Sequence, residues 1–480
     1  MKVGDRRQVE GGRRVRGRKN GRPGQRPRRP LEGWAKLTRR LRRASPILLL
    51  SLAALPAGLA AQGGEWPTLS AMGIEYLSPS GAFQVSLSGQ LDLEALYVSN
   101  AWGGLTSVEG GADLLKGSPE DCSACHTEVP FGSTEGGLAP HRLRIFTNVF
   151  LGDHFFSLVE LRSDRGEAAS DGRVRARVEQ AYLRVANREG SWGVQTGRFA
   201  SPVGAYPLRH LSVVDPFLRP PLGYDFRTLM NRTVVPADEA GLLEWRHSPE
   251  DFRRPGAPPV WDVPYQWGAL AFGHLLGTDV RVAAVNSAPS SAPDAWAFDV
   301  DRLRDPSWVV ALRRRLSIDW EVGLSWNRGP WMEAPTSGVI RPRPGDGAGA
   351  PAPSYKDFDQ EILTADVTFA RGATMLHAEA MLDRWGVPNI ADRPTEVIYD
   401  VELQRDLAAG LFAAGRVGHI DFRGLGGGED WDRDVTRYEA SLGYRITKNA
   451  GVLLSAYEQV QSQASDADAR FAGLRLWWAF

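Results

Sequence analysis

An alternation of apolar and polar side chains recurs from residue 83 to the end of this 480-residue chain. In segment 83–97, apolar residues such as Val85 and Leu87 alternate with polar residues such as Ser86 and Gln90. A period of two is typical of a β-strand with one apolar and one polar face. A run of about 15 residues is long for a strand of a soluble protein, but it suits the tilted strand of a membrane-spanning barrel. The pattern therefore predicts an all-β chain.

Seventeen segments show this pattern, and turn-forming residues separate them. They are 83–97, 141–151, 155–163, 174–186, 191–199, 239–247, 264–275, 278–287, 306–317, 318–328, 358–371, 373–385, 395–407, 410–423, 434–447, 450–463 and 467–480. Short connections alternate with long ones rich in Gly, Pro and Ser, as in bacterial outer-membrane barrels. The alternation slips by one strand between 200 and 238, which predicts one further strand near 226–235. We therefore expect a transmembrane antiparallel up-and-down β-barrel of about 18 strands, with about 16 as the alternative.

The two ends of the chain indicate export and barrel assembly. Residues 1–43 hold 17 of the 57 basic residues and three of the 57 acidic ones, which leaves 40 basic and 54 acidic residues for the rest. The apolar run Pro46 to Ala60 follows this arm, and small residues end it, so residues 1–60 resemble a basic arm with a cleaved signal peptide. At the other end Phe480 completes an alternating strand and resembles the terminal signal that the barrel-assembly machinery binds.

Three segments follow from these observations. Residues 61–80 form a short N-terminal lead, and residues 81–480 form the barrel. We expect the lipid bilayer of the outer membrane around the barrel, with the many Trp and Tyr residues at its two interfaces. The acidic balance of the exported part argues against a nucleic-acid partner.

The only two cysteines lie in the motif Cys122-Ser123-Ala124-Cys125-His126, inside the long loop 99–140. C-x-x-C-H is the attachment sequence of a c-type haem, in which both thiols bind the porphyrin covalently and the histidine ligates the iron. We therefore expect one covalent haem c, with His126 as its metal ligand. A disulfide between the two cysteines, a zinc half-site and an inert loop are the alternatives. Cys122, Cys125 and His126 are expected inside the barrel or at its mouth.

A sixth iron ligand is sought among residues that loops could bring close to this motif. The candidates are His141, His154, His210 and Met230. The last two lie in segment 200–238, which we expect to fold inward as a constriction loop. Catalytic triads, phosphate loops and carboxylate pairs do not stand out, so any enzymatic role would be electron transfer.

Charged side chains at inward strand positions could set the selectivity of a lumen. The arginines are Arg142, Arg144, Arg162, Arg175, Arg177, Arg184 and Arg198, and the carboxylates that could face them are Glu160, Glu179, Asp215 and Asp225. A solvated barrel wall would also be charged, so this pattern alone does not assign an anion site.

A signal peptide, one C-x-x-C-H motif at Cys122–His126 and a barrel that ends in Phe480 together resemble the fused monohaem cytochrome–porins of iron-oxidising bacteria. The resemblance implies that one haem in the barrel mouth moves electrons across the outer membrane, from a donor such as ferrous iron to a periplasmic electron carrier. The alternative is a passive diffusion porin for small solutes, in which Cys122 and Cys125 form a loop disulfide.

Overall fold

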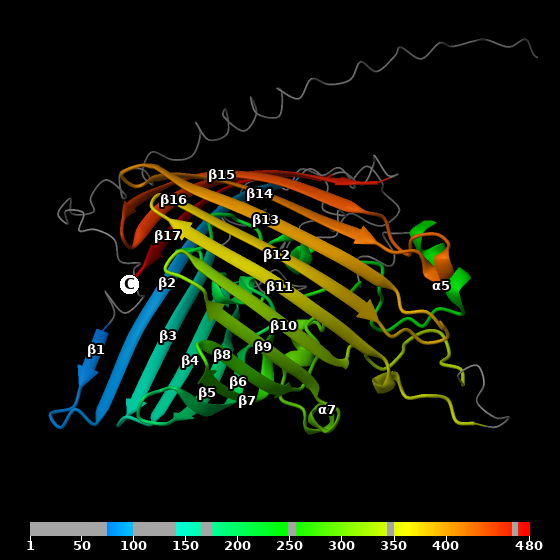
Figure 1. Cartoon of the computed structure of the whole chain (residues 1–480), viewed down its shortest axis with the longest axis horizontal. Helices are drawn as coiled ribbons and strands as arrows, with labels where there is room; N and C mark the ends of the chain where they lie inside the picture. The colour runs from blue at the N-terminus through cyan, green and yellow to red at the C-terminus, as the bar shows by residue number, and fades with distance from the viewer. Residues whose placement is uncertain (1–73, 99–140, 165–174, 248–255, 343–349, 463–468) are drawn as a thin grey trace, which may run out of the picture. The chain divides into compact units, whose positions relative to one another are not determined.

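A closed ring of sixteen antiparallel strands dominates the part of the chain that the structure describes (Figure 1). The computed structural model describes residues 74–98, 141–164, 175–247, 256–342, 350–462 and 469–480. Each strand from β2 to β17 pairs with the next one along the chain, and β17 pairs with β2 to close the ring. Closure pairs every strand on both sides, so no strand edge is left along the wall.

The strands of the ring are nine to sixteen residues long except for β8, which has eight. They are β2 (Phe83–Val98), β3 (His141–Leu151), β4 (Phe155–Asp164), β5 (Arg175–Ala186), β6 (Trp192–Ala200), β7 (Tyr265–Leu275), β8 (Thr278–Val285), β9 (Ser307–Arg315), β10 (Trp320–Pro330), β11 (Asp359–Arg371), β12 (Thr374–Trp385), β13 (Thr395–Ala408), β14 (Leu411–Phe422), β15 (Val435–Thr447), β16 (Ala450–Gln461) and β17 (Ala469–Ala479). A further short strand, β1 (Ile74–Leu77), pairs with the first residues of β2.

The strand count is therefore the smaller of the two expected numbers, and one predicted segment is not a strand. Residues 239–247, expected to be extended, form helix α5 (Glu239–Glu244) and the 3-10 turn η4 (Trp245–His247). The Asp238 side chain caps α5 by accepting a hydrogen bond from the amide of Gly241, and Leu242 and Trp245 are buried. Segment 226–235, expected to hide a strand, makes isolated bridges instead, such as Asn231 with Gly256. Once 239–247 is not counted as a strand, short and long connections alternate regularly. The further strand expected near 226–235 is then not needed.

Short turns lie at one end of the barrel and long connections at the other. Positive-φ glycines make several of the turns, as Gly152 does between β3 and β4 and Gly372 between β11 and β12. The connection from β6 to β7, residues 201–264, is the longest whose course the structure describes for the most part. We call these the turn end and the loop end.

The remaining short helices lie in the long connections. They are η3 (Tyr206–Leu208), α4 (Leu222–Asp225), η5 (Pro293–Trp296), α7 (Val300–Arg304), η6 (Tyr355–Asp357) and η7 (Leu425–Gly427). Among the described residues, no helix is both long enough and apolar enough to cross a membrane.

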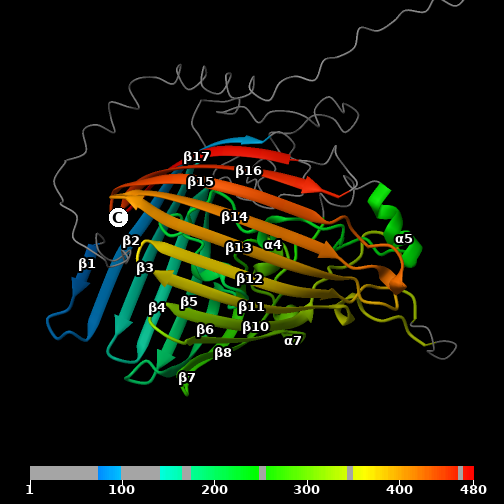
Figure 2. The ribbon, with the colours of Figure 1, turned by 45° about the horizontal axis from the view of Figure 1, so that its top comes forward.

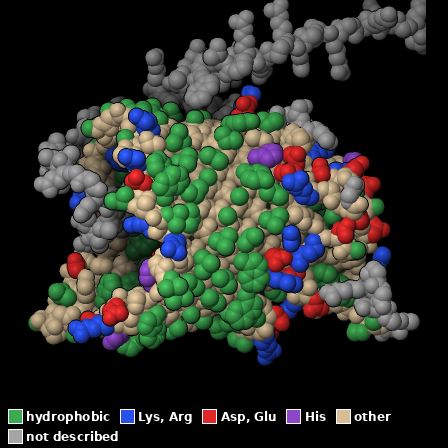
Figure 3. Space-filling model, viewed as in Figure 1, with side chains coloured by type: hydrophobic (Ala, Val, Ile, Leu, Met, Phe, Trp, Pro, Cys, Tyr) green, Lys and Arg blue, Asp and Glu red, His purple; other side chains and the backbone are tan. Residues whose placement is uncertain are grey.

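The outer face of the strand wall is apolar. Outward side chains such as Leu161, Val194, Leu363 and Val417 are exposed, and Figure 3 shows hydrophobic side chains spread over the wall, with charged ones gathered toward the loop end. Exposed aromatic residues mark both rims. Trp192, Trp320, Tyr444 and Trp478 lie toward the turn end, and Trp308, Tyr399 and Tyr438 lie toward the loop end.

Water would not stabilise so large an apolar band, whereas the hydrocarbon core of a bilayer does. A closed antiparallel barrel with such a band and two aromatic girdles is the outer-membrane type of membrane protein. The protein is an outer-membrane β-barrel.

Candidate functional site in the barrel lumen

The lumen of the barrel contains residues 201–236, which we call the internal segment; Figure 2 shows α4, which belongs to it, behind the strands of the wall. Proline recurs throughout it, as at Pro202, Pro216 and the pair Pro220 and Pro221. Proline has no N–H to donate to a strand ladder, so this sequence is excluded from the sheet and must satisfy its carbonyls in other ways. Within the described residues, most of the segment from 201 to 236 is buried.

Three arginines of the wall bind carbonyl oxygens of the internal segment. Arg475 on β17 donates to the carbonyls of Phe217 (3.0 Å) and Leu218 (3.1 Å). Arg416 on β14 donates to the carbonyls of Arg219 (2.6 Å) and Pro220 (3.2 Å). Arg437 on β15 donates to the carbonyl of Pro220 at 3.2 Å. The guanidinium groups thereby donate charge-assisted hydrogen bonds in place of the backbone N–H groups that the prolines lack.

Other strands hold the start of the internal segment. The amide of Gly204 donates to Ser325 Oγ on β10 (2.9 Å), and the amide of Ala205 donates to Glu379 on β12 (2.9 Å). The hydroxyl of Tyr224 donates to the same Glu379 carboxylate at 2.9 Å. The internal segment therefore contacts strands from β10 to β17 and closes much of the lumen on that side.

An apolar core fills the space between the segment and the wall. Tyr224, Phe226 and Leu229 are fully buried in it, and they pack with wall residues such as Ile398 and Ile420. Burial of this kind stabilises by about 1.5–3 kcal/mol per large side chain, which favours a fixed position of the segment over a mobile one. The part of the lumen toward the loop end is therefore packed like the interior of a soluble domain.

His210, expected as a candidate iron ligand, has both ring nitrogens engaged. Nδ1 donates to the carbonyl of Pro207 (2.8 Å), and Nε2 accepts from the Arg144 guanidinium (3.0 Å) and lies 3.2 Å from the Tyr265 hydroxyl. Burial, followed by the charge of Arg144, holds the pKa of His210 well below its usual range, so the imidazole is neutral. Met230, the other candidate from this segment, is fully buried in the core.

The haem motif itself lies outside the described residues, as does the rest of 99–140, so Cys122, Cys125 and His126 have no described position. His141 begins β3, and His154 lies in the turn that follows that strand, where its Nδ1 contacts the carbonyl of Ala186 at 2.9 Å. Among the described residues, no group of three or more His, Cys, Asp or Glu side chains could hold a metal ion.

Charged side chains cover the inner face of β2 to β5 in alternating signs. Arg144 pairs with Glu160 at 3.0 Å, and Arg162 and Arg177 both pair with Asp164. Three of the four expected carboxylates also have arginine partners. Glu160 pairs with Arg144, Glu179 contacts Arg177 at 2.6 Å, and Asp225 contacts Arg437 at 2.9 Å.

Asp215 is the fourth of these carboxylates, and it lies in the internal segment. Its pKa is raised to about 7, chiefly by burial and also by the charge of Glu402, whereas Arg416 and Arg209 act against the rise. Its Oδ1 accepts from the amide of Phe217 at 3.1 Å. Asp215 is therefore a buried carboxyl group that titrates near neutral pH.

The sequence did not indicate the importance of Arg416, Arg437 and Arg475, which bind the carbonyls of the internal segment. Their inward positions follow from strand alternation, but nothing local to them indicates the distant Pro-rich segment as their partner.

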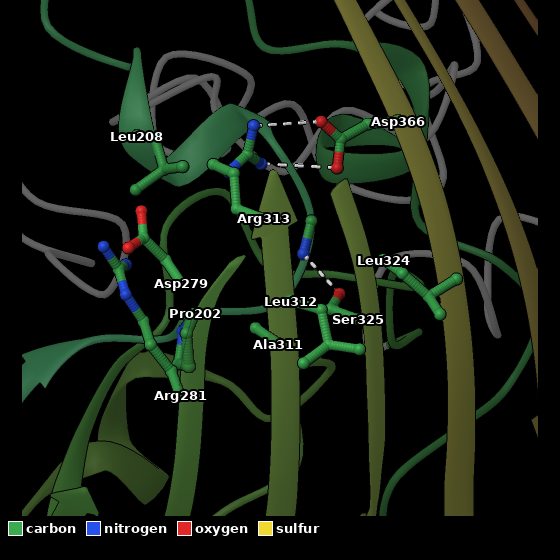
Figure 4. A pocket seen from close by; sticks show the side chains of 11 residues that line it. Pro202, Leu208, Asp279, Arg281, Ala311, Leu312, Arg313, Leu324, Ser325 and Asp366 are labelled. Atoms are coloured by element: carbon green, nitrogen blue, oxygen red, sulfur yellow. Dashed lines mark hydrogen bonds and ion pairs between the residues drawn. The ribbon is translucent and has the colours of Figure 1, made fainter. Parts of the chain in front are cut away.

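A small, partly open pocket of about 20 Å³ lies between the start of the internal segment and strands β8 to β11 (Figure 4). Pro202 and Leu208 line it from the segment, and Arg281 and Arg313 line it from the wall. Arg313 is neutralised by Asp366 (3.1 Å) and by Glu321 (2.9 Å). The lumen thus keeps open space on the side that the internal segment does not fill.

No protein-family model matches the chain, and no curated protein matches it. Solved structures of outer-membrane channels resemble it at low identity. OmpF of Salmonella typhi in complex with daunomycin is 11% identical, with a TM-score of 0.49 over 85% of this chain and 100% of that one. DcaP of Acinetobacter baumannii is 12% identical, with a TM-score of 0.49 over 84% of this chain and 99% of that one. An anion-selective porin from Comamonas acidovorans is 10% identical, with a TM-score of 0.48 over 83% of this chain and 100% of that one. Values at this level do not assign a solute to the present chain.

Proposed function

We propose that the protein is a porin-like outer-membrane channel whose lumen is narrowed to small solutes by the internal segment. The observation on which this rests is the set of hydrogen bonds that ties residues 201–236 to strands on the β10–β17 side of the wall. A wide pore would need that segment to lie against one wall only, whereas it also contacts the strands beyond β17: Ser212 donates to Asp92 on β2 (2.7 Å), and His210 contacts Arg144 on β3 (3.0 Å).

The open part of the lumen supports the same proposal. The pocket beside β8 to β11 has charged and polar lining residues, including Arg281, Asp279 and Ser325. Rings and rows of charge in a lumen select solutes by sign as well as by size. A small charged or polar solute therefore fits this space better than a large neutral one.

Conductance and swelling measurements test the channel. Purified protein in planar bilayers should give small single-channel conductances, and proteoliposomes should swell in monosaccharides but not in tetrasaccharides. Rapid swelling in tetrasaccharides would contradict a narrowed lumen, and the absence of any conductance would contradict a channel.

A second candidate function rests on the sequence Cys122-Ser123-Ala124-Cys125-His126. We propose that both thiols of this loop bind one haem c covalently, that His126 ligates its iron, and that electrons cross the outer membrane by this route. The bound haem would supply one-electron chemistry. His210 and Met230 stay predictions as further ligands, because each would have to leave the contacts it makes in the internal segment.

Covalent haem can be tested on the full chain, expressed in a host that matures c-type cytochromes. The outer-membrane band should stain for haem and give a reduced-minus-oxidised spectrum, and both signals should vanish in Cys122→Ser and Cys125→Ser. Loss of haem with retention of heat-modifiable migration would show that the barrel itself is intact. A wild-type barrel without covalent haem would leave the loop disulfide and the channel function.

A further inference from the structure

Two arginines on the inner wall have no carboxylate partner among the residues that the structure describes. Arg184 lies on β5 and Arg281 on β8, and both are only partly buried. In the described part of the chain, no carboxylate oxygen lies within 4.0 Å of either guanidinium. Asp279 lies two residues from Arg281 along β8 and acts on it electrostatically from beyond 4.0 Å, while its carboxylate contacts His274 at 2.8 Å.

Other arginines of the lumen contrast with this pair. Eight of them have a carboxylate within 4.0 Å, namely Arg144, Arg162, Arg177, Arg209, Arg313, Arg416, Arg437 and Arg475. The wall is thus close to neutral where it binds the internal segment. Two positive charges without carboxylate partners remain on the side facing the open space.

Strand register brings the two arginines together with an aromatic ring. Phe272 on β7 is the direct cross-strand partner of Arg281, so their side chains lie on the same inner face. The Arg184 guanidinium lies 5.0 Å from the centre of the Phe272 ring. It also lies 5.7 Å from the ring centres of Phe156 and Tyr182.

Arg184 is also held in a fixed position. Its Nε and Nη2 atoms donate to Gln195 Oε1 on β6 at 3.1 and 2.8 Å. A neutral amide fixes the guanidinium without cancelling its charge, and the aromatic rings around it lower the cost of ordering it. Such an arrangement is prepared for an anion.

We propose that Arg184 and Arg281 form a binding site for a small aromatic carboxylate, whose ring packs beside Phe272. A carboxylate matches the planar fork of a guanidinium with two parallel hydrogen bonds. An aromatic body gains from contact with the Phe272 ring. Pro202 and Leu208, which line the adjoining pocket with Arg281, extend the apolar surface available to such a ligand (Figure 4). The inference builds on the proposed channel, whose solute class it names.

Binding can be measured without transport. We would titrate the full-length protein in detergent with 4-fluorobenzoate and follow the fluorine NMR signal. The neutral 4-fluorobenzamide would report partition into micelles, and fluoroacetate would report charge without a ring. We expect 4-fluorobenzoate to bind at least about tenfold more tightly than either, because the site supplies charge-assisted hydrogen bonds and an aromatic contact together. Binding of 4-fluorobenzoate no tighter than that of either control would overturn the proposal.

Matched variants identify the residues. Arg184→Gln and Arg281→Gln should each weaken 4-fluorobenzoate binding about tenfold. Arg371→Gln removes the same charge from an arginine at the turn end that is 77% exposed, and it should change nothing. Equal losses in all three variants would indicate a general field effect, and an unchanged affinity in Arg281→Gln would exclude the site. Should Arg184→Gln fail to show heat-modifiable migration, Arg184→Lys and Arg281→Gln decide the matter.

Conductance separates this proposal from the channel. Binding of 4-fluorobenzoate without conductance would leave the site standing and remove the channel. Conductance without preferential binding of 4-fluorobenzoate would support the channel and exclude the binding site.

Discussion

The hydroxyl of Tyr224 donates a hydrogen bond of 2.9 Å to the carboxylate of Glu379, and the two residues are 155 positions apart in the sequence. One belongs to the internal segment and the other to strand β12. This bond ties the segment to the β12 wall, while the bonds of Arg475 tie it to β17.

Tyr224→Phe should loosen the internal segment without unfolding the barrel. The substitution removes a buried hydrogen bond to a carboxyl acceptor, and we expect a loss of about 1–3 kcal/mol. Thermal unfolding followed by heat-modifiable migration would measure the loss, and bilayer recordings should show larger or noisier conductance. Tyr438→Phe changes a tyrosine on the lipid face that is 55% exposed, and it serves as the control. Equal effects of the two substitutions would contradict the assigned role of Tyr224.

Gly204→Ala should destabilise the start of the internal segment. Gly204 has a φ of +74°, and a Cβ at this position would overlap the Tyr224 hydroxyl. Gly372→Ala is a matched control, because its φ is +59° and a Cβ there would have nothing within 4 Å. Both variants bear the backbone cost of about 1–2 kcal/mol, but only Gly204→Ala must also displace a side chain. Comparing their unfolding temperatures isolates the steric part, and equal shifts would argue against the tight contact.

Asp215 should make the stability of the packed lumen depend on pH. Its pKa in the folded protein, about 7, lies above its ordinary value, so the folded state binds a proton that the unfolded state releases. The contribution is therefore fully present below the unfolded pKa and is lost as the pH rises through 7. Between those two values the slope is about 1.4 kcal/mol per pH unit.

Unfolding of the wild type and of Asp215→Asn, each at pH 5 and pH 8, measures this contribution. Asparagine keeps the shape but carries no charge, so the variant should be the more stable protein at pH 8 and should lose the added pH dependence. A wild-type pH dependence that survives in Asp215→Asn would assign the titration to another group.

Phe480 should be needed for closure of the ring. Its amide and carbonyl exchange hydrogen bonds of 2.9 and 2.7 Å with Gly89 of β2, and Gly89 leaves room for its ring. Removing Phe480 should lower the amount of heat-modifiable barrel in the outer-membrane fraction, measured by gel shift after fractionation. Phe155→Ala, at an aromatic residue of the turn end that is 45% exposed, should have little effect. Normal yield without Phe480 would show that closure does not depend on it.

Sixteen of the seventeen segments predicted as strands are strands, because alternation is a local property that each segment shows by itself. The strand predicted at 239–247 is wrong for a related reason, because a short local pattern can fit a strand and a helix equally well. Leu242, Leu243 and Trp245 fit a single buried helical turn as well as a short strand, and the cap at Asp238 was the signal that distinguishes them.

The packing of the lumen could not be predicted in this way. Arg416 and Pro220 are 196 residues apart, and their contact depends on the register of every strand between them. Likewise, the lack of a carboxylate near Arg184 is a property of five neighbouring strands together. Inward positions could be read from the sequence, but not which charges cancel one another.

The internal segment lies between β6 and β7, yet the arginines that hold its carbonyls belong to β14, β15 and β17. The proline-rich segment therefore has these donors only where β14, β15 and β17 have taken their places in the wall. The lumen can acquire its native interior only after the last strand has arrived and joined the first. An agent that keeps the final strand from joining the wall would therefore leave the internal segment without the hydrogen bonds that Arg475 donates to it.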